Sequence, residues 1–184
     1  DFGAQAVQTY AHFEGIQNSL SGLTGSAEKG KALFEDLRKF SFDTTFGVDT
    51  LAQASTMLMQ TGTSAGELKT RLKQLGGIAG GDTEKFNRLT EVFAKIQNMG
   101  KTNGQLLQSL QLLGVPITQE LQKMGIAGQA TSEQVVEAFQ RMTAEGGIFH
   151  DNMESMVAPE KMMGAMNDYA SMYRNMMTLK QRLN

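Results

Sequence analysis

Glycine residues divide the middle of this sequence into short segments, and no other feature constrains its fold as strongly. Between Gly76 and Gly125, apolar residues recur at steps of three and four, which is the spacing of one face of an α-helix. Glycine stands at the end of each run, where it readily adopts the left-handed conformation that ends many helices. The spacing therefore predicts short helices that turn back on one another, and it argues against a continuous rod.

Three helices are predicted in this middle part. Asp82 is a good N-cap, because its side-chain oxygen can accept a backbone N–H of the first turn, and Pro116 cannot continue a helix. The predicted elements are a helix capped by Asp82 and ended by Gly100, a helix opened by Gly104 and closed by Gly114 and Pro116, and a helix from Ile117 to Met124 that stops at Gly125. Their apolar faces consist of Phe86, Leu89, Phe93 and Ile96 in the first and Leu106, Leu107, Leu110 and Leu113 in the second.

Further helices are predicted on both sides from the same signals. Upstream, we expect a helix ending near Gly25, a helix capped by Ser26 and running to Phe40, an extended linker over Ser41 to Val48, a helix over Thr50 to Thr61 capped by Asp49, and a helix to Ile78 with Ser64 and Glu67 at capping-box spacing. Downstream, we expect a helix capped by Thr131 or Ser132 and ending at Gly146-Gly147, a turn at Phe149, and a helix from Pro159.

The two ends of the chain carry longer seams with alternating steps of three and four. The seams consist of Phe2, Ala6, Thr9, Phe13, Ile16, Leu20 and Leu23 at the start, and of Met162, Met166, Tyr169, Tyr173, Met176 and Leu183 at the end. We therefore predict an all-α protein with a compact domain of short, glycine-interrupted helices at 26–157 and amphipathic helical arms at 1–25 and 158–184. The seams fit two interpretations: parts of a longer coiled rod, or helices that pack on the domain or on each other.

Composition limits the classes of function. With 40% apolar and 20% charged residues in 184, the chain is typical of a soluble globular protein. A net charge of -2 gives no electrostatic basis for binding nucleic acid. No cysteine is present, so a disulfide or a thiolate site is impossible, and no run approaches the roughly 20 apolar residues of a membrane span. Because the chain begins at Asp1 without a methionine, we expect it to be a piece of a longer polypeptide.

No catalytic, cofactor-binding or metal-binding residue is expected. His12 and His150 stand far apart and have no ligand residues at recognised spacing. Gly76 to Gly81 precede a helix start that could bind an anion, but Asp82 places a carboxylate there and no P-loop Lys-Ser/Thr pair follows. The carboxylates that could form a glycosidase pair are better explained by helix capping and solvation; they are Glu67, Glu84, Glu91, Glu133, Glu137 and Glu145.

Six short motifs follow one another along the chain. They are Leu33-Phe34-Glu35-Asp36-Leu37, Thr44-Thr45-Phe46 with Asp49-Thr50-Leu51, Gly76-Gly77-Ile78-Ala79-Gly80-Gly81-Asp82, Gly100-Lys101-Thr102-Asn103-Gly104-Gln105-Leu106, Leu113-Gly114-Val115-Pro116-Ile117, and Ala144-Glu145-Gly146-Gly147 with Phe149. In this order, the motifs resemble the N-terminal globular domain of phage and prophage tail tape measure proteins. The resemblance spans roughly Lys31 to Met156. The chain departs from the family at Thr44-Thr45-Phe46, where Thr-Pro-Phe is common, and over Val157 to Gly164, where the family tends to have a Ser/Thr-rich turn.

The resemblance implies a non-enzymatic virion structural protein whose full chain sets tail length, with this part as an anchoring or initiating domain. It implies the tail tube protein, the tail tip or baseplate hub and the tail assembly chaperones as partners, and the virion tail and the host cytoplasm during assembly as locations. The helical arms could also form a homo-oligomer. Two alternatives stay open: a cell-wall-remodelling enzyme or accessory used in genome delivery, and an unrelated helical adaptor.

Overall fold

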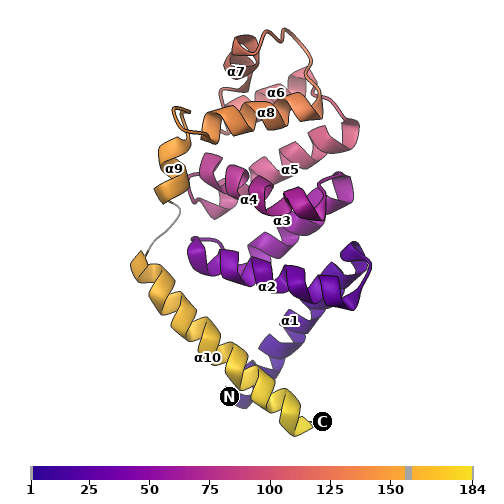
Figure 1. The fold of residues 1–184 in the computed structure, drawn as a ribbon, viewed down its shortest axis with the longest axis vertical. Helices are drawn as coiled ribbons and strands as arrows, with labels where there is room; N and C mark the ends of the chain where they lie inside the picture. Colours follow the sequence, from indigo (N-terminus) through magenta and orange to yellow (C-terminus); the bar gives the residue numbers. More distant parts are fainter. Residues whose placement is uncertain (1, 156–158, 184) are drawn as a thin grey trace. The chain divides into compact units, whose positions relative to one another are not determined.

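The chain is helical throughout the part that the structure describes. The computed structural model describes residues 2–155 and 159–183, which form ten α-helices and no β-strand (Figure 1). The all-α prediction is therefore confirmed. Contacts divide the chain into two units, one of residues 1–52 with 158–184 and one of residues 53–157, and the boundary falls inside α3 (Val48–Thr61).

The first unit is built on α1 (Phe2–Thr24), α2 (Ala27–Asp43) and α10 (Pro159–Leu183), which all contact one another. Ser26 caps α2 as predicted, and its hydroxyl accepts the N–H of Lys29 at 3.1 Å. Gly30 of α2 lies so close to Ser21 of α1 that a Cβ would overlap the Ser21 backbone. This close approach lets α1 and α2 form a tight helical hairpin.

The core of this unit lies between the three helices. Its most deeply buried side chains include Leu20 of α1 and Phe34, Leu37 and Phe40 of α2. The two terminal helices thus pack on α2 and on each other, in line with the second interpretation of their seams. The predicted division into 1–25, 26–157 and 158–184 stays a prediction. In the structure, residues 26–52 group with the terminal helices, because the turn at Gly25 folds α2 back onto α1.

The segment between α2 and α3 differs from the predicted linker over Ser41 to Val48. Helix α2 continues to Asp43, and α3 already begins at Val48. The extra turn of α2 carries Phe42, whose ring lies 5.5 Å from the guanidinium carbon of Arg38 one turn earlier. Asp49 was also wrongly predicted as an N-cap, because it lies within the first turn of α3.

The second unit contains the rest of α3 and six further helices: α4 (Ala65–Ile78), α5 (Thr83–Met99), α6 (Gly104–Leu112), α7 (Ile117–Lys123), α8 (Ser132–Thr143) and α9 (His150–Ser155). Helix α4 contacts α5, α8 and α9, and α7 contacts α6 and α8. The core is formed by Phe86, Phe93 and Phe139 with Leu68, Leu72, Leu75 and Ile78 of α4. The rings of Phe93 and Phe139 lie 5.5 Å apart.

Glycines end these helices where the sequence places them. Gly100 has φ 78° at the end of α5 and Gly114 has φ 85° after α6, which are left-handed conformations that cost other residues energy. Asp82 caps α5 by accepting the Lys85 N–H at 2.8 Å. Thr131, rather than Ser132, caps α8, where it forms a capping box with Gln134. The predicted succession of short helices is therefore confirmed.

The end of α8 was predicted too late. The helix stops at Thr143, and Ala144 is extended with ψ 167°. Gly146 and Gly147 instead form a turn in which Gly147 packs on the carbonyls of Arg141 and Met142, where a Cβ would overlap them. The Phe149 N–H then donates to the Met142 carbonyl at 2.8 Å. The turn expected at Phe149 thus leads into helix α9.

Candidate interaction surfaces

The two histidines lie in different units. In the first unit, Nε2 of His12 is hydrogen-bonded to Oδ1 of Asp49, and both side chains are exposed. In the second, His150 begins α9, and its Nδ1 lies 3.3 Å from the carbonyl oxygen of Thr143. Within residues 2–155 and 159–183, no group of three His, Cys, Asp or Glu residues could hold a metal ion. The sequence did not indicate the His12–Asp49 pair, because the partners are 37 positions apart.

The glycine-rich segment before α5 has a structural role. Gly77 lies in α4, and a Cβ there would overlap the sulfur of Met153 in α9. Gly80 and Gly81 have φ 64° and 82°, and they bring the chain from α4 to the N-cap of α5. The Asp82 carboxylate occupies that N-cap and accepts the Lys85 N–H, so the position of a bound anion is already taken by a negative charge.

The carboxylates considered for an acid–base pair all lie at the surface, and each of the six is exposed. Glu84, for example, forms an exposed ion pair with Arg88 at 2.7 Å. The prediction that the chain contains no catalytic, cofactor-binding or metal-binding residue stays a prediction.

A buried carboxylate was not indicated by the sequence. Glu120 of α7 is 9% exposed, and its Oε1 accepts a hydrogen bond from Nε of Arg141 in α8 at 2.8 Å. Lys123 lies 3.9 Å from the other carboxylate oxygen. A buried charge requires a partner, and this pair joins α7 to α8. The two partners are 21 positions apart, and no local pattern connects them.

A buried cation lies in the centre of the second unit. The Arg71 side chain donates from Nη1 to Oε1 of Gln74 at 2.6 Å, and its guanidinium carbon lies 5.6 Å from the centre of the Phe93 ring. Burial lowers the pKa of Arg71 from its ordinary value, and the negative charge of Glu67 partly offsets this effect. The hydrogen bond lies within α4, whereas the ring contact joins α4 to α5, and the buried Nε of Arg71 has no hydrogen-bond partner among the described residues.

A second polar cluster fixes α10 on α2 in the first unit. The Tyr173 hydroxyl donates to Oε1 of Glu35 at 3.2 Å, and Arg38 donates to Oε2 of the same carboxylate at 2.7 Å. The Arg38 guanidinium also lies 4.8 Å from the centre of the Tyr173 ring. Burial, followed by the negative charge of Glu35, raises the pKa of Tyr173. The cluster orients the C-terminal half of α10.

Large apolar side chains are exposed on both units. On the second unit they are Met99, Leu112 and Ile148, and on the first Val7, Met172, Met177 and Leu183. Leu112 is 80% exposed at the end of α6, beside a surface hollow whose lining includes Lys85 and Arg88. Isolated surface apolar residues are common, but Met172 and Met177 of α10 line two adjoining cavities. In the described part of the chain, none of the helices is both long enough and apolar enough to cross a membrane.

Comparison with known proteins gives one family. A family model described as "Tape measure protein" matches residues 4–178 of this chain. Comparisons with curated proteins and with solved structures give no significant match.

Proposed function

The chain belongs to the tape measure protein family, whose members are structural components of the phage tail, and we propose that it supplies an anchoring or initiating domain for tail assembly. In this proposal the parent protein sets tail length through extended helical segments. The chain described here docks with the tail tip or baseplate hub, the tail tube protein or the assembly chaperones. It is located in the virion tail, and in the host cytoplasm during assembly.

The observation that carries the proposal is the shortness of the helices in residues 53–157. The longest helix entirely within this unit, α5, has 17 residues, which gives a length of about 26 Å at about 1.5 Å per residue. As one continuous helix, the 105 residues from 53 to 157 would reach about 160 Å. A segment that folds back in this way spans little of the length of a tail tube. It does present a defined surface to a partner.

A non-enzymatic role is part of the proposal. The six surface carboxylates are solvated, and Glu120 is neutralised by Arg141 and Lys123. We therefore expect no clearing of peptidoglycan in a zymogram of the purified chain, with lysozyme as the positive control. Clearing that is lost in a Glu120→Gln variant would support a cell-wall-remodelling role instead.

Cross-linking in cells that are assembling tails tests the docking role. Exposed lysines of the second unit, such as Lys69, Lys95 and Lys101, provide attachment points for an amine-reactive cross-linker. We expect mass spectrometry to find cross-links from these lysines to the tail tip, tail tube or chaperone proteins. Cross-links exclusively to lysines spaced along extended segments of other tape measure molecules would contradict the proposal, because they would place this unit in the measuring rod.

A further inference from the structure

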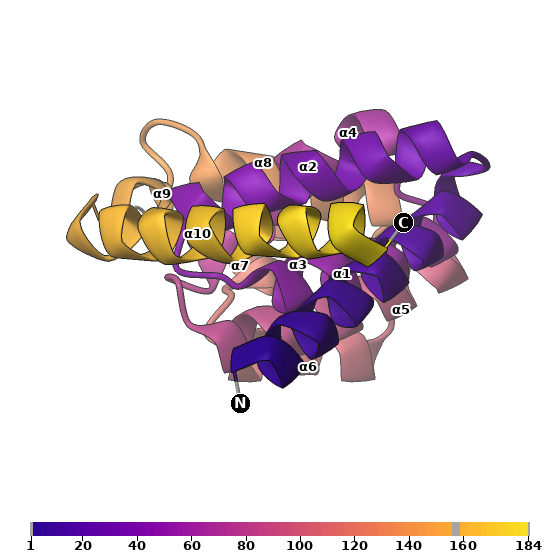
Figure 2. The same ribbon diagram turned by 90° about the horizontal axis from the view of Figure 1, so that it is seen from below.

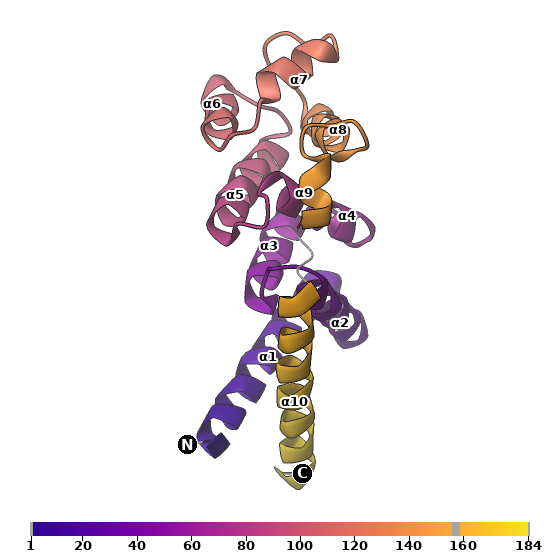
Figure 3. The same cartoon turned by 90° about the vertical axis from the view of Figure 1, so that its left-hand side faces the viewer.

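Two adjoining cavities lie between α1 and α10 in the first unit, where the two helices contact each other and cross at an angle (Figures 2 and 3). The first has a volume of about 320 Å³ and the second of about 180 Å³, and Met176 lines both. We call the two cavities together the α1/α10 groove.

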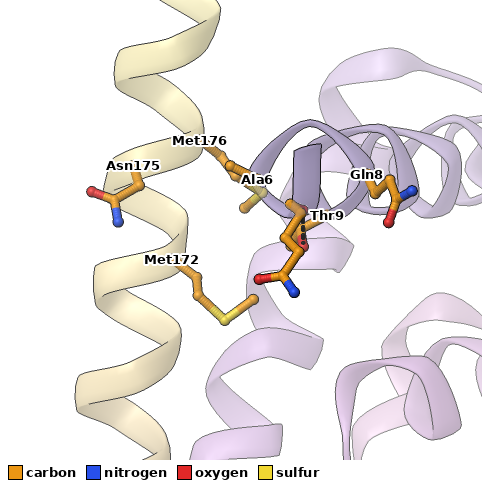
Figure 4. Close-up of a pocket in the computed structure, with 7 residues that line it drawn as sticks. Ala6, Gln8, Thr9, Met172, Asn175 and Met176 are labelled. Carbon is orange, nitrogen blue, oxygen red and sulfur yellow. Dashed lines mark hydrogen bonds between the residues drawn. The ribbon is translucent and has the colours of Figure 1, made fainter. Parts of the chain in front are cut away.

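The first cavity has an apolar floor. Met176 is 3% exposed and forms part of this floor, whereas Met172 is 43% exposed and forms a wall; Figure 4 shows both on the side of α10 that faces α1. The Thr9 hydroxyl donates to the carbonyl of Gln5 at 2.8 Å, so its hydrogen-bonding need is met within α1. Methionine side chains adapt to partners of different shape, which suits a protein-binding surface.

The rim of the first cavity is polar but uncharged. Gln5, Gln8 and Asn175 contribute to its lining, and none of its described lining residues is titratable. Its volume lies at the low end of the roughly 300–1,000 Å³ typical of small-molecule sites. An apolar floor with a polar, uncharged rim accommodates apolar side chains from a partner.

The described charged residues that line the second cavity are Lys31, Lys180 and Glu14. Glu35, which accepts a hydrogen bond from the lining residue Tyr173, is paired with Arg38. The Lys180 ammonium lies 5.7 Å from the centre of the Tyr10 ring. Between residues 171 and 183, α10 carries Arg174, Lys180 and Arg182 and no carboxylate. Glu14 is the single acidic residue in α1. A partner for this groove is therefore expected to carry negative charge.

We propose that the α1/α10 groove binds an amphipathic helix with an acidic polar face from another tail protein. Such a helix presents apolar residues at steps of three and four, which can enter the two adjoining cavities. Its carboxylates would then face Lys31 and Lys180. The inference rests on the proposed docking function in one respect, which is that the partner is a tail protein. The groove itself belongs to the first unit, whereas the docking function was argued from the second unit.

Binding of two synthetic peptides to the whole chain tests this inference. Both are helical 20-residue peptides with the same leucine stripe, but one has glutamate and the other lysine at its polar positions. We expect the acidic peptide to bind at least tenfold more tightly by fluorescence anisotropy at low salt, and to lose most of this preference at high salt. Equal affinity for the two peptides, or binding of neither, would overturn the proposal.

Two matched variants locate the binding site. Met172→Gln removes apolar surface from the groove, and Met99→Gln makes the same change at a similarly exposed methionine of the other unit, with 43% and 48% exposure respectively. We expect Met172→Gln to weaken binding of the acidic peptide about tenfold and Met99→Gln to leave it unchanged. Lys180→Glu should reverse the peptide preference. Equal effects of the two methionine variants would place binding outside the groove and overturn the proposal.

A second copy of the chain is the competing occupant. Light scattering without peptide would then show a dimer that Met172→Gln returns to a monomer, and the acidic peptide would fail to bind. That result would overturn the proposed partner. The cross-linking experiment is independent of this outcome, since it reports on lysines of residues 53–157. If the peptide fails to bind but cross-links to tail proteins form, the groove is rejected as a binding site and the docking function is kept.

Discussion

The contact between Gly77 of α4 and Met153 of α9 makes the sign of one stability change predictable. Replacing a helical glycine by alanine normally stabilises a helix by about 0.5–1 kcal/mol, because glycine loses more backbone entropy on folding. At Gly77, however, an added Cβ would overlap the sulfur of Met153 and lie 3.2 Å from its Cγ. Since Gly77 is buried, the methionine or the whole of α9 must move.

The expected magnitude combines these two effects. Adding a methyl group to a packed site typically costs about 1–3 kcal/mol, although a flexible methionine relieves part of this strain. We therefore expect Gly77→Ala to lower the free energy of unfolding of the second unit by about 1 kcal/mol, as the balance of clash and helix propensity. In a Met153→Ala background the clash is absent, and the same substitution should stabilise the unit by about 0.5–1 kcal/mol.

Urea unfolding followed by circular dichroism measures this double-mutant cycle on the whole chain. Gly66→Ala is the matched control, because Gly66 lies in the same helix and a Cβ there has nothing within 4 Å. It should be neutral or stabilising in both backgrounds. If Gly77→Ala stabilises the wild-type protein as much as Gly66→Ala does, with no coupling to Met153, the proposed close packing of α4 and α9 is refuted.

Three further predictions follow from single contacts. Gly100→Ala should cost roughly 1–2 kcal/mol in unfolding free energy, because φ is 78° there. The control Gly104→Ala, in the first turn of α6, should be neutral or stabilising. Equal effects of the two substitutions would argue against a left-handed cap. Glu120→Gln should lower the unfolding free energy by about 1–3 kcal/mol, because it weakens the buried pair with Arg141. The same substitution at the exposed Glu137 should change stability little. A Glu120→Gln variant of unchanged stability would contradict the pairing. Because the pKa of Tyr173 is raised, its contribution to stability is complete below the ordinary value of 10.0 and is lost as pH rises above that value. Between pH 9 and 11, the unfolding free energy of the Tyr173→Phe variant should therefore decrease less than that of the wild type. An unchanged pH profile would count against the Glu35 contact.

The parts of the fold that the sequence predicted well are held by local interactions. Ser26, Asp82 and Thr131 each accept a backbone N–H three residues later, so the cap and its partner are adjacent in the sequence. Gly100 and Gly114 end their helices because of their own backbone conformation. A glycine after an apolar stripe carries this information without reference to the rest of the chain.

The errors and omissions involve contacts between distant residues. Glu35 and Tyr173 are 138 positions apart, and their hydrogen bond exists only because α10 packs on α2. The linker after Phe40 is a local exception: it was predicted too long, because α2 continues to Asp43. For the candidate surfaces, the seams of α1 and α10 were visible in the sequence, whereas the groove between them depends on how the helices meet.

Tail length in phage particles tests most directly whether this part of the protein is a docking unit or part of the ruler. The decisive change is an in-frame deletion of residues 53–157 from the tape measure gene, compared with a deletion of equal size from a segment predicted to be continuous helix. The docking account predicts that the first deletion sharply reduces the number of tails while those that form keep their normal length, and that the second shortens tails by about 160 Å at about 1.5 Å per residue. A normal yield of tails shortened by about 160 Å after deletion of residues 53–157 would contradict it.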